Sequence, residues 1–308
     1  MTTSRKPIVI AGSISMDMVT LTPRIPGVGE TVIGSRYSTT PGGKGANQAV
    51  AAARLGYPVE MVGKVGDDAY GQPLIESLRE SGVGVGSMGI EPGSSGLAAI
   101  FLSEAGENSI VIVQGANGKV DPAHIDSHAD VIRSAGMVLC QVELPMETTV
   151  HTIRMAAEAG VPVMLDPAPA APLPDELFPR IAWFTPNETE AAMYVAPGLS
   201  AEEAAARLLA KRLKGVALKR GAEGAYVAVA GGKAEWVRAF RVATVDTVGA
   251  GDCFNGAFAV AMMEGKDPWE AARFASAAAA ISVTRRGAQA SMPERAEVEG
   301  FLATHAGG

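Results

Sequence analysis

The chain has 308 residues, of which 47% are hydrophobic, and it carries a formal net charge of −7. This length suffices for one large α/β domain, or for one domain with a small appendage, and allows a full hydrophobic core. The acidic balance gives no reason to expect nucleic acid or an anionic membrane as a partner.

In the first third of the chain, the sequence predicts strands, two helices and a small flap. An apolar strand at 8–12 precedes Asp17, which would lie at a strand end, where α/β sheets place ligand contacts. Residues 27–40 alternate and are rich in Gly, which is typical of a small β flap. A helix over 48–55 closes at Gly56, and a strand near 59–65, a helix near 70–81 and a Gly-rich bend at 84–89 follow.

The alternating segments 96–103 and 108–114 indicate a hairpin, and with the flap they would form a small sheet apart from the main one. From residue 137 onward, strands and helices alternate. We expect strands at 137–142, 161–165, 181–185, 216–219, 226–230 and 235–240, helices at 146–160, 188–194 and 201–213, and two Ala-rich helices near the end. Repeated βα units predict a doubly wound, mostly parallel sheet with right-handed crossovers.

The end of the chain and its cysteines predict a cytoplasmic protein. The N-terminal residues MTTSRKP lack the apolar stretch of a signal peptide, and no apolar run reaches membrane-spanning length. The two cysteines, Cys140 and Cys253, lie in apolar surroundings. Reduced core thiols are favoured over a disulfide, because disulfides persist mainly in oxidising compartments.

The stretch VDTVGAGDCFNG, from Val245 to Gly256, is the strongest candidate for chemistry. It lies between an expected extended segment and a buried helix that we expect from Cys253 onward. Small residues at 249–251 let the backbone approach a ligand, and free N–H groups at a helix start suit a phosphate. Asp252 at that entrance is either a helix cap or a general base, and the stretch alone leaves both open.

Three other patterns resemble sites and are weaker. The G-x-G-x-x-G at 84–89 does not sit between a clear strand and a helix, so we expect no nicotinamide site there. Gly45 follows Lys44 where a P-loop requires Ser or Thr. His124 and His128 are one helical turn apart, and an exposed helix face is favoured over a metal site.

Two further clusters are polar in apolar settings. Asp17 would join Asn47 and the glycines at 42–43, which together let a hydroxylated ligand lie against the backbone. Asn187 and Glu190 share one helical face at a strand end. Their residue types are compatible with helix capping or with ordering hydrated Mg²⁺ and phosphate, and both interpretations stay open.

Together these clusters resemble the PfkB carbohydrate kinases, and most closely their ribokinase branch. Both halves of the family signature are present, as GGKGANQAVAAARLG from Gly42 to Gly56 and DTVGAGDCFNGAF from Asp246 to Phe258. The segments PNETE and VTRRGAQAS, the latter from Val283 to Ser291, also match. The resemblance runs essentially from residue 8 to residue 302.

The resemblance implies one ribokinase-like domain over 1–308 with a β-sheet lid from segments near 15–40 and 96–115. It implies transfer of the γ-phosphate of ATP to a sugar hydroxyl, with D-ribose to ribose 5-phosphate as first choice, and with Mg²⁺ and K⁺ as cofactors. It also implies a homodimer through the lid. Another pentose, deoxyribose or a nucleoside stays open as acceptor, because Ser15 stands where typical ribokinases have Asn. A sugar- or nucleotide-binding regulator without turnover is the alternative of another class.

The resemblance also assigns roles to residues. Asp252 would be the catalytic base, beside an anion hole of the Gly249, Ala250 and Gly251 amides. Sugar contacts would come from Ser15, Met16, Asp17, Gly43, Lys44, Gly45, Ala46, Asn47 and Glu143. Nucleotide contacts would come from Asn187, Glu190, Lys219, Arg220, Gly221, Ala222, Glu223, Gly224, Gly251, Asp252 and Ser276. The monovalent cation would take oxygens, mostly backbone carbonyls, from Asp246, Val248, Ser282, Arg285, Gly287 and Ser291.

Overall fold

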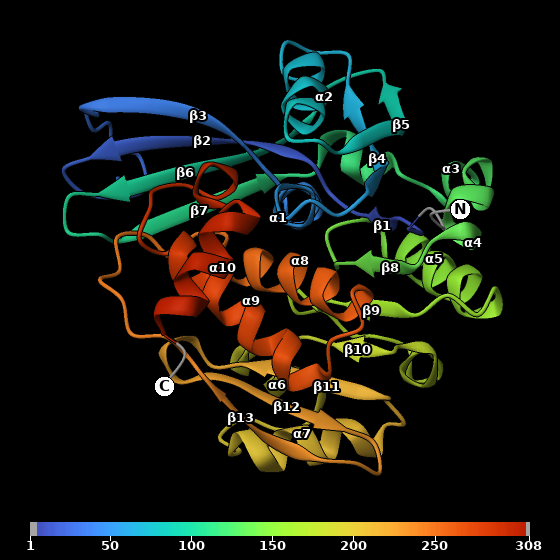
Figure 1. Ribbon diagram of the computed structural model, residues 1–308. Helices are drawn as coiled ribbons and strands as arrows, with labels where there is room; N and C mark the ends of the chain where they lie inside the picture. The colour runs from blue at the N-terminus through green and yellow to red at the C-terminus, as the bar shows by residue number, and fades with distance from the viewer. Residues whose placement is uncertain (1–4, 306–308) are drawn as a thin grey trace.

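The computed structural model describes residues 5–305, which form two β-sheets and the helices that pack on them (Figure 1). The larger sheet has nine strands in the order β13-β12-β11-β10-β9-β8-β1-β4-β5. Their bounds are β1 Ile8–Ala11, β4 Val59–Gly66, β5 Gly84–Glu91, β8 Met137–Cys140, β9 Val163–Leu165, β10 Trp183–Phe184, β11 Gly215–Lys219, β12 Gly224–Val229 and β13 Ala234–Arg238.

The strands from β11 to β5 pair in parallel, while β12 and β13 are antiparallel at one edge. β1, with the sequence IVIA, is buried at every position and pairs with both β4 and β8. The strand order therefore reverses at β1. The next strands along the chain, β4 and β5, lie on one side of β1, and the strands from β8 onward lie on the other side. In doubly wound sheets, ligands bind beyond the carboxyl ends of strands near such a reversal.

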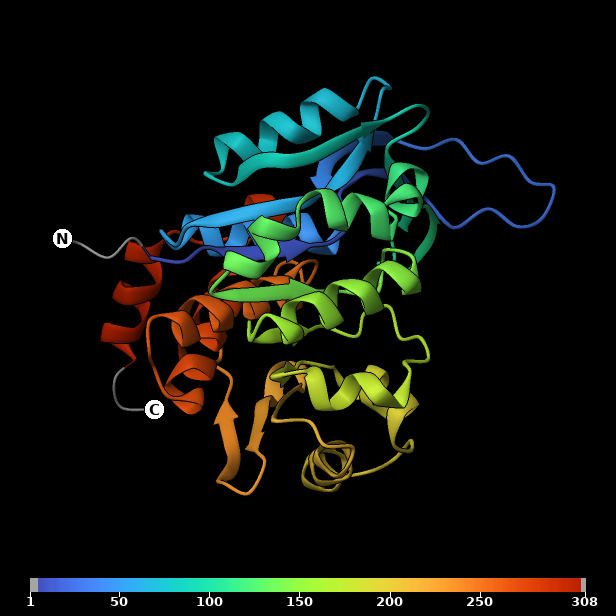
Figure 2. The same ribbon diagram turned by 90° about the vertical axis from the view of Figure 1, so that its right-hand side faces the viewer.

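Helices cover both faces of this sheet (Figures 1 and 2). One face packs against α1 Lys44–Arg54, α2 Gly71–Glu80, α8 Ala250–Met263, α9 Pro268–Ser282 and α10 Arg295–Thr304. The other face packs against α3 Pro122–Ser127, α4 Ala129–Ser134, α5 Met146–Glu158, α6 Glu188–Tyr194 and α7 Ala201–Ala210. None of the helices in the described residues combines the length and apolar character needed to cross a membrane.

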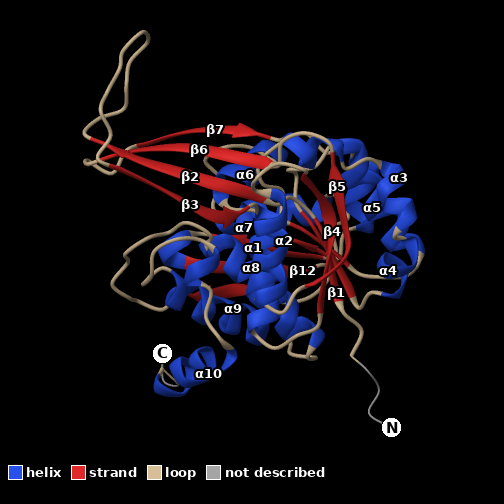
Figure 3. Ribbon diagram, turned by 90° about the horizontal axis from the view of Figure 1, so that it is seen from above, coloured by secondary structure: helices blue, strands red, loops and turns tan. Residues whose placement is uncertain are grey.

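The smaller sheet has four strands in the order β3-β2-β6-β7, namely β3 Arg36–Gly42, β2 Ser15–Thr22, β6 Gly96–Ser103 and β7 Asn108–Val113. It extends away from the main body, and the loop of residues 23–35 lies at its far end (Figure 3). β6 and β7 form the expected hairpin. β2 starts only three residues after β1 ends, so the two sheets are joined directly beside the carboxyl end of β1.

Several expected boundaries are wrong. Residues 84–91 form the edge strand β5 and not a bend, and residues 15–22, in the expected lid segment, form the strand β2, whereas alternation was seen only from residue 27. α1 begins at Lys44 and α8 at Ala250, earlier than expected, while residues 241–246 are loop and not an extended strand. His124 and His128 do not share an exposed helix face, because α3 ends between them and His124 is half-buried against Gly89.

Candidate active site

A cleft of about 790 Å³ lies beyond the carboxyl ends of β9, β10 and β11 and reaches the N-terminus of α8. Two lysines, three carboxylates and the first turn of α8 line it, and small residues form much of its remaining wall. Twelve residues singled out from the sequence line this cleft: Lys44, Asn187, Glu190, Lys219, Gly221, Ala222, Gly224, Gly249, Ala250, Gly251, Asp252 and Ser276.

The first turn of α8 is built for close approach to a ligand. Gly249 is the N-cap and has a φ of 75°, a left-handed conformation that disfavours residues with a Cβ. The Ala250 N–H donates to the Thr247 carbonyl at 3.2 Å, whereas within residues 5–305 no backbone carbonyl accepts from Gly249 or Gly251. Two of the three expected anion-hole amides are therefore open, at the positive end of the helix dipole.

Asp252 is 6% exposed and lines the cleft. It does not cap its helix. Its Oδ2 accepts from Asn47 Nδ2 at 2.9 Å, and its Oδ1 accepts from Gln48 Nε2 at 3.1 Å. Burial is the main cause that raises the pKa of Asp252, to about 6, and the nearby carboxylate of Asp166 adds to the increase. Asp252 is thus a carboxylate at neutral pH that retains useful basicity.

A second polar group joins the start of β2 to the start of α1. The carboxylate of Asp17 lies against Gly42, where a Cβ would be 2.3 Å from Oδ2, so a side chain at position 42 would displace Asp17. Ser15 Oγ donates to Asp17 Oδ1 at 3.3 Å. The pKa of Asp17 is raised to about 6, mainly by burial, with smaller increases from the carboxylates of Glu143 and Asp252.

Glu143 anchors the N-terminus of α1. Its Oε2 accepts from the Lys44 backbone N–H at 3.1 Å and from the Ser13 hydroxyl. The ammonium group of Lys44 faces the cleft, where burial lowers its pKa but the surrounding carboxylates outweigh burial and raise it. Those carboxylates belong to Asp252, Asp166, Glu143 and Glu190. A positive charge on Lys44 is therefore stable in the cleft.

Asn187 and Glu190 form a capping box at the start of α6. Asn187 Oδ1 accepts from the Glu190 N–H, and Glu190 Oε2 accepts from the Asn187 N–H, both at 2.8 Å. Helix capping is thus observed, and both side chains nevertheless line the cleft. Burial raises the pKa of Glu190. A capped, rigid carboxylate at the cleft wall remains able to orient hydrated Mg²⁺.

The end of β11 contributes a cation. Lys219 Nζ donates to Asp166 Oδ1 at 3.0 Å, with side chains 14% and 3% exposed. The same Nζ lies 3.6 Å from the position of a Cβ added at Gly251, so it is close to the open amides of α8. Arg220 and Glu223, expected beside it, do not line the cleft and form an ion pair with each other at 3.1 Å.

The six residues expected around a monovalent cation fall in residues 246–248 and in residues 282–291, which begin with the last residue of α9. Backbone hydrogen bonds from Val245 and Asp246 to the Val283 carbonyl join these two segments. Asp246 Oδ1 accepts from the Val248 N–H at 3.0 Å, and Oδ2 accepts from the Gly287 N–H at 2.9 Å. Ser282 and Ser291 are buried nearby along the chain, while the Arg285 side chain turns to Glu297. Backbone carbonyls of two clamped loops are a donor set that fits a large monovalent cation. In the described residues, no group of three or more His, Cys, Asp or Glu side chains is arranged to hold a metal.

Sequence reasoning missed several residues of the cleft. Asp166 directly follows β9, and a carboxylate placed directly after a buried strand was the available signal. Gln48 lies in α1 between Asn47 and the apolar residues 49–53, and it gave only the signal of a polar residue at the edge of an apolar run. Phe240, Arg241 and Val242 line the cleft from the loop after β13, and of these only Phe240 lay in the strand expected at 235–240.

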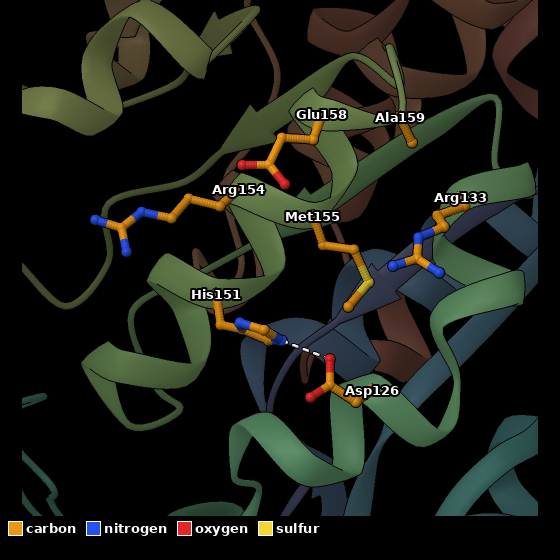
Figure 4. A pocket seen from close by; sticks show the side chains of 7 residues that line it. All are labelled: Asp126, Arg133, His151, Arg154, Met155, Glu158 and Ala159. Carbon is orange, nitrogen blue, oxygen red and sulfur yellow. Dashed lines mark hydrogen bonds and ion pairs between the residues drawn. The ribbon is translucent and has the colours of Figure 1, made fainter.

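A second hollow of about 380 Å³ lies on the surface between α3, α4 and α5 (Figure 4). His151 Nε2 and Asp126 Oδ1 are 2.7 Å apart there, and Arg154 and Glu158 pair with residues outside it. These side chains are partly exposed and mostly engaged in ion pairs. The hollow shares no residue with the cleft and lacks its convergence of open amides and carboxylates.

Comparison with known proteins agrees with this geometry. Residues 5–295 match the model of the pfkB family of carbohydrate kinases. A ribokinase of Bacillus subtilis is 46% identical over 298 residues, covering 96% of this chain and 99% of that protein. A deoxyribokinase of Salmonella typhi is 37% identical, covering 96% and 98%. The structure of Arabidopsis thaliana ribokinase complexed with ribose and ATP is 38% identical, with a TM-score of 0.91, covering 97% and 99%.

The chain therefore belongs to the pfkB family of carbohydrate kinases, and its fold is the ribokinase-like α/β fold with a separate small sheet. Its relatives and the family identify it as an ATP-dependent sugar kinase.

Proposed function

We propose that this kinase transfers the γ-phosphate of ATP to the 5-hydroxyl of D-ribose, with Asp252 as the general base. The observation that carries the proposal is the position of Asp252, which lines the cleft at the open N-terminus of α8 and is hydrogen-bonded to Asn47 at the start of α1. Ribose is the acceptor favoured by the B. subtilis relative and by the ligands named for the A. thaliana structure.

In the proposed mechanism, the oxygen of the sugar hydroxyl attacks the γ-phosphorus of ATP, and ADP leaves. The carboxylate of Asp252 accepts the proton of that hydroxyl. The open N–H groups of Gly249 and Gly251 would donate to the oxygens of the transferring phosphoryl group. Lys219 and Lys44, both at the cleft wall, would balance the negative charge. Positioning and electrostatic stabilisation of this kind are what phosphoryl transfer chiefly requires.

The sugar would lie between the two sheets, held by directional polar groups. Asp17, Asn47 and Glu143 supply acceptors and donors, and the backbone at Gly43 permits close contact. Asn47 Oδ1 supports this assignment, because it is buried without a hydrogen-bond partner in the described residues. Such an atom is costly to leave unsatisfied, and a sugar hydroxyl would satisfy it. Ser15, Met16, Lys44, Gly45 and Ala46 would shape the same wall.

Nucleotide binding would use the other end of the cleft. Asn187 and Glu190 would hold hydrated Mg²⁺, which supplies charge neutralisation for the phosphates. Residues 219–224 and Ser276 would line the nucleotide. The clamped loops around Asp246 would hold K⁺ through oxygens of Asp246, Val248, Ser282, Arg285, Gly287 and Ser291.

The small sheet would act as a lid that excludes water during transfer. It would also pair two copies of the chain. Exposed apolar side chains on β7, namely Ile110, Val111 and Ile112, support this, since such surface on a strand is commonly covered by a partner. The two free, buried cysteines support a reducing, cytoplasmic location.

Deoxyribose is the principal alternative acceptor. Ser15 is hydrogen-bonded to Asp17, which we assign to sugar binding, and the S. typhi relative at 37% identity is named a deoxyribokinase. A site that uses a donor to recognise a hydroxyl discriminates strongly against the analogue that lacks it. The ratio of kcat/KM for ribose and deoxyribose therefore measures which acceptor the site is built for.

The test is coupled ADP release with ribose, deoxyribose, a hexose and a nucleoside. We expect the highest kcat/KM with ribose, and we expect Asp252→Asn to lower turnover at least about 10²-fold while ATP binding remains. Asp175→Asn removes an exposed carboxylate far from the cleft and is the control. No ADP release with any acceptor would favour a binding regulator, and a fully active Asp252→Asn variant would remove the proposed base.

A further inference from the structure

Gln48 occupies the centre of a buried polar network that links the two ends of the cleft. It is 0% exposed and lies on α1. Its Nε2 donates to Asp252 Oδ1 at 3.1 Å and to Asp166 Oδ2 at 3.0 Å. Its Oε1 accepts from Gln141 Nε2 at 2.8 Å. The Gln48 side chain therefore uses its NH₂ group twice and its oxygen once in hydrogen bonds to side chains that are distant in the sequence.

The orientation of the Gln48 amide is dictated by these partners. A carboxylate only accepts hydrogen bonds when ionised, so the NH₂ group must face Asp252 and Asp166. Turning the amide over would set its oxygen against two carboxylates and its nitrogen against the donating nitrogen of Gln141. Both contacts would be repulsive in a buried site, where electrostatic interactions are strong.

We propose that Gln48 is a positioning residue for Asp252, because its amide fixes the Asp252 carboxylate and joins it to Asp166 and, through Asp166, to Lys219. The inference rests on the proposed function of Asp252 as the base. Asn47 holds Oδ2 of Asp252 and Gln48 holds Oδ1, so the plane of the carboxylate is set from α1. The second oxygen of Asp166 accepts from Lys219. The side-chain amide of Gln48 thus fixes the Asp252 carboxylate relative to Lys219, whose ammonium group lies near the open backbone N–H groups of α8.

Several charged groups surround the Asp252 carboxylate. Asp252 is faced by Lys44 from α1, by Asp166 after β9 and by Asp17 from β2, and Lys219 from β11 balances Asp166. The Asp166 charge repels the ionised form of Asp252, whereas the Gln48 hydrogen bond to Asp252 favours it. Loss of the Gln48 donor therefore raises the proton affinity of Asp252, whereas removal of the Asp166 charge lowers it.

The opposite signs of these two effects provide the test. The pKa of Asp252 is read from ¹³C NMR titration of protein labelled at Asp Cγ, with its resonance assigned by its absence in Asp252→Asn. We expect Gln48→Met to raise the proton affinity of Asp252 about tenfold, one pH unit, which is the scale of one hydrogen bond to a charged group. Asp166→Asn should shift the titration to lower pH. Gln289→Met, a buried glutamine outside the network, should leave it unchanged.

Steady-state kinetics with ATP and ribose complete the experiment. With Gln48→Met, the acid limb of the kcat/KM profile should move upward with the NMR pKa, and kcat at the optimum should fall at least about tenfold with little change in the KM for ATP. The pKa of Asp17 is also raised to about 6, so the profile is repeated in Asp17→Asn. An NMR pKa that Gln48→Met leaves unmoved would overturn the role of Gln48, and Asp166→Asn tests the same network if Gln48→Met does not fold. A third outcome would overturn both the proposed function of Asp252 and the positioning role of Gln48. In that outcome, Gln48→Met shifts the NMR pKa of Asp252 but leaves the acid limb of the kcat/KM profile unchanged, and the Asp252→Asn variant is active.

Discussion

The crossing of α1 and α8 offers a sharp test of how packing positions the base. Gly256 lies one turn after Asp252 and packs directly on α1. A Cβ added at Gly256 would lie 2.7 Å from Ala51 Cβ and 2.7 Å from the Gln48 carbonyl oxygen. Carbon atoms pack at about 3.5–4.0 Å, so Gly256→Ala must separate the two helices by about 1 Å. The Asn47 and Gln48 hydrogen bonds to Asp252 cross this same interface.

The magnitude follows from two opposing effects. Alanine in place of glycine within a helix stabilises by about 1 kcal/mol, and overpacking a filled interface destabilises by about 1–3 kcal/mol. Gly300→Ala in α10 is a matched control, because no atom lies within 4 Å of the added Cβ. It should gain the helical stabilisation without the clash. The two variants should therefore differ by about 1–3 kcal/mol in unfolding free energy, with Gly256→Ala the less stable.

The assays are thermal unfolding and steady-state ADP release. A displacement of about 1 Å at reacting groups lowers turnover by up to about 10²-fold, so kcat of Gly256→Ala should fall while Gly300→Ala retains normal kcat. Adding Ala51→Gly removes one of the two clashing atoms and should restore part of the lost kcat. If Gly256→Ala is as stable as Gly300→Ala and turns over normally, the interface does not position the base and the reasoning is wrong.

Other predictions concern charge. Lys219→Met leaves the buried Asp166 carboxylate without its cation and should lower the free energy of unfolding by about 3–5 kcal/mol. Lys211→Met breaks an exposed ion pair and should lower it by under about 1 kcal/mol. Chemical denaturation of both variants measures the difference. Because Asp252 must be ionised to accept a proton, kcat/KM should fall as pH drops below about 6, and a flat profile to pH 5 would contradict this. The folded pKa of Asp252 is raised above its unfolded value, so the folded state binds the extra proton between about pH 4 and 6. Stability of the free protein should therefore decline as pH rises through that window, and Asp252→Asn should lack this contribution in thermal unfolding.

The sequence predicted the central architecture because the parallel strands are buried on both faces and stand out as short apolar runs. The hairpin of β6 and β7 was recognisable from its alternation. β5 was not, since the Gly-rich segment GVGSMGIE has little strand propensity and is held by parallel pairing with β4. β2 was missed because most of its side chains are half-buried, which erases the contrast between its two faces.

The cleft was predictable where local sequence carries the chemistry, as in the α8 turn and the Asn187–Glu190 capping box. Gln48 and Asp166 could not be assigned in this way. The Gln48 hydrogen bonds join residues 118 and 204 positions apart, and only the folded chain brings those partners together. The loop after β13 was missed for a similar reason, because its apolar residues serve as cleft wall and not as strand.

The start of α8 explains why open amides lie beside the proposed base. Four other helices, α6, α7, α9 and α10, close their own N-termini with capping boxes. α8 begins at Gly249, which has no side chain to cap it, and the carboxylate of Asp252 is held away by Asn47 and Gln48. If Asp252 turned back to cap α8, it would fill the anion position with a negative charge and lose its place as a base. Its two hydrogen bonds to α1 therefore keep the amides open and the carboxylate in place at the same time, so loss of either bond should lower kcat.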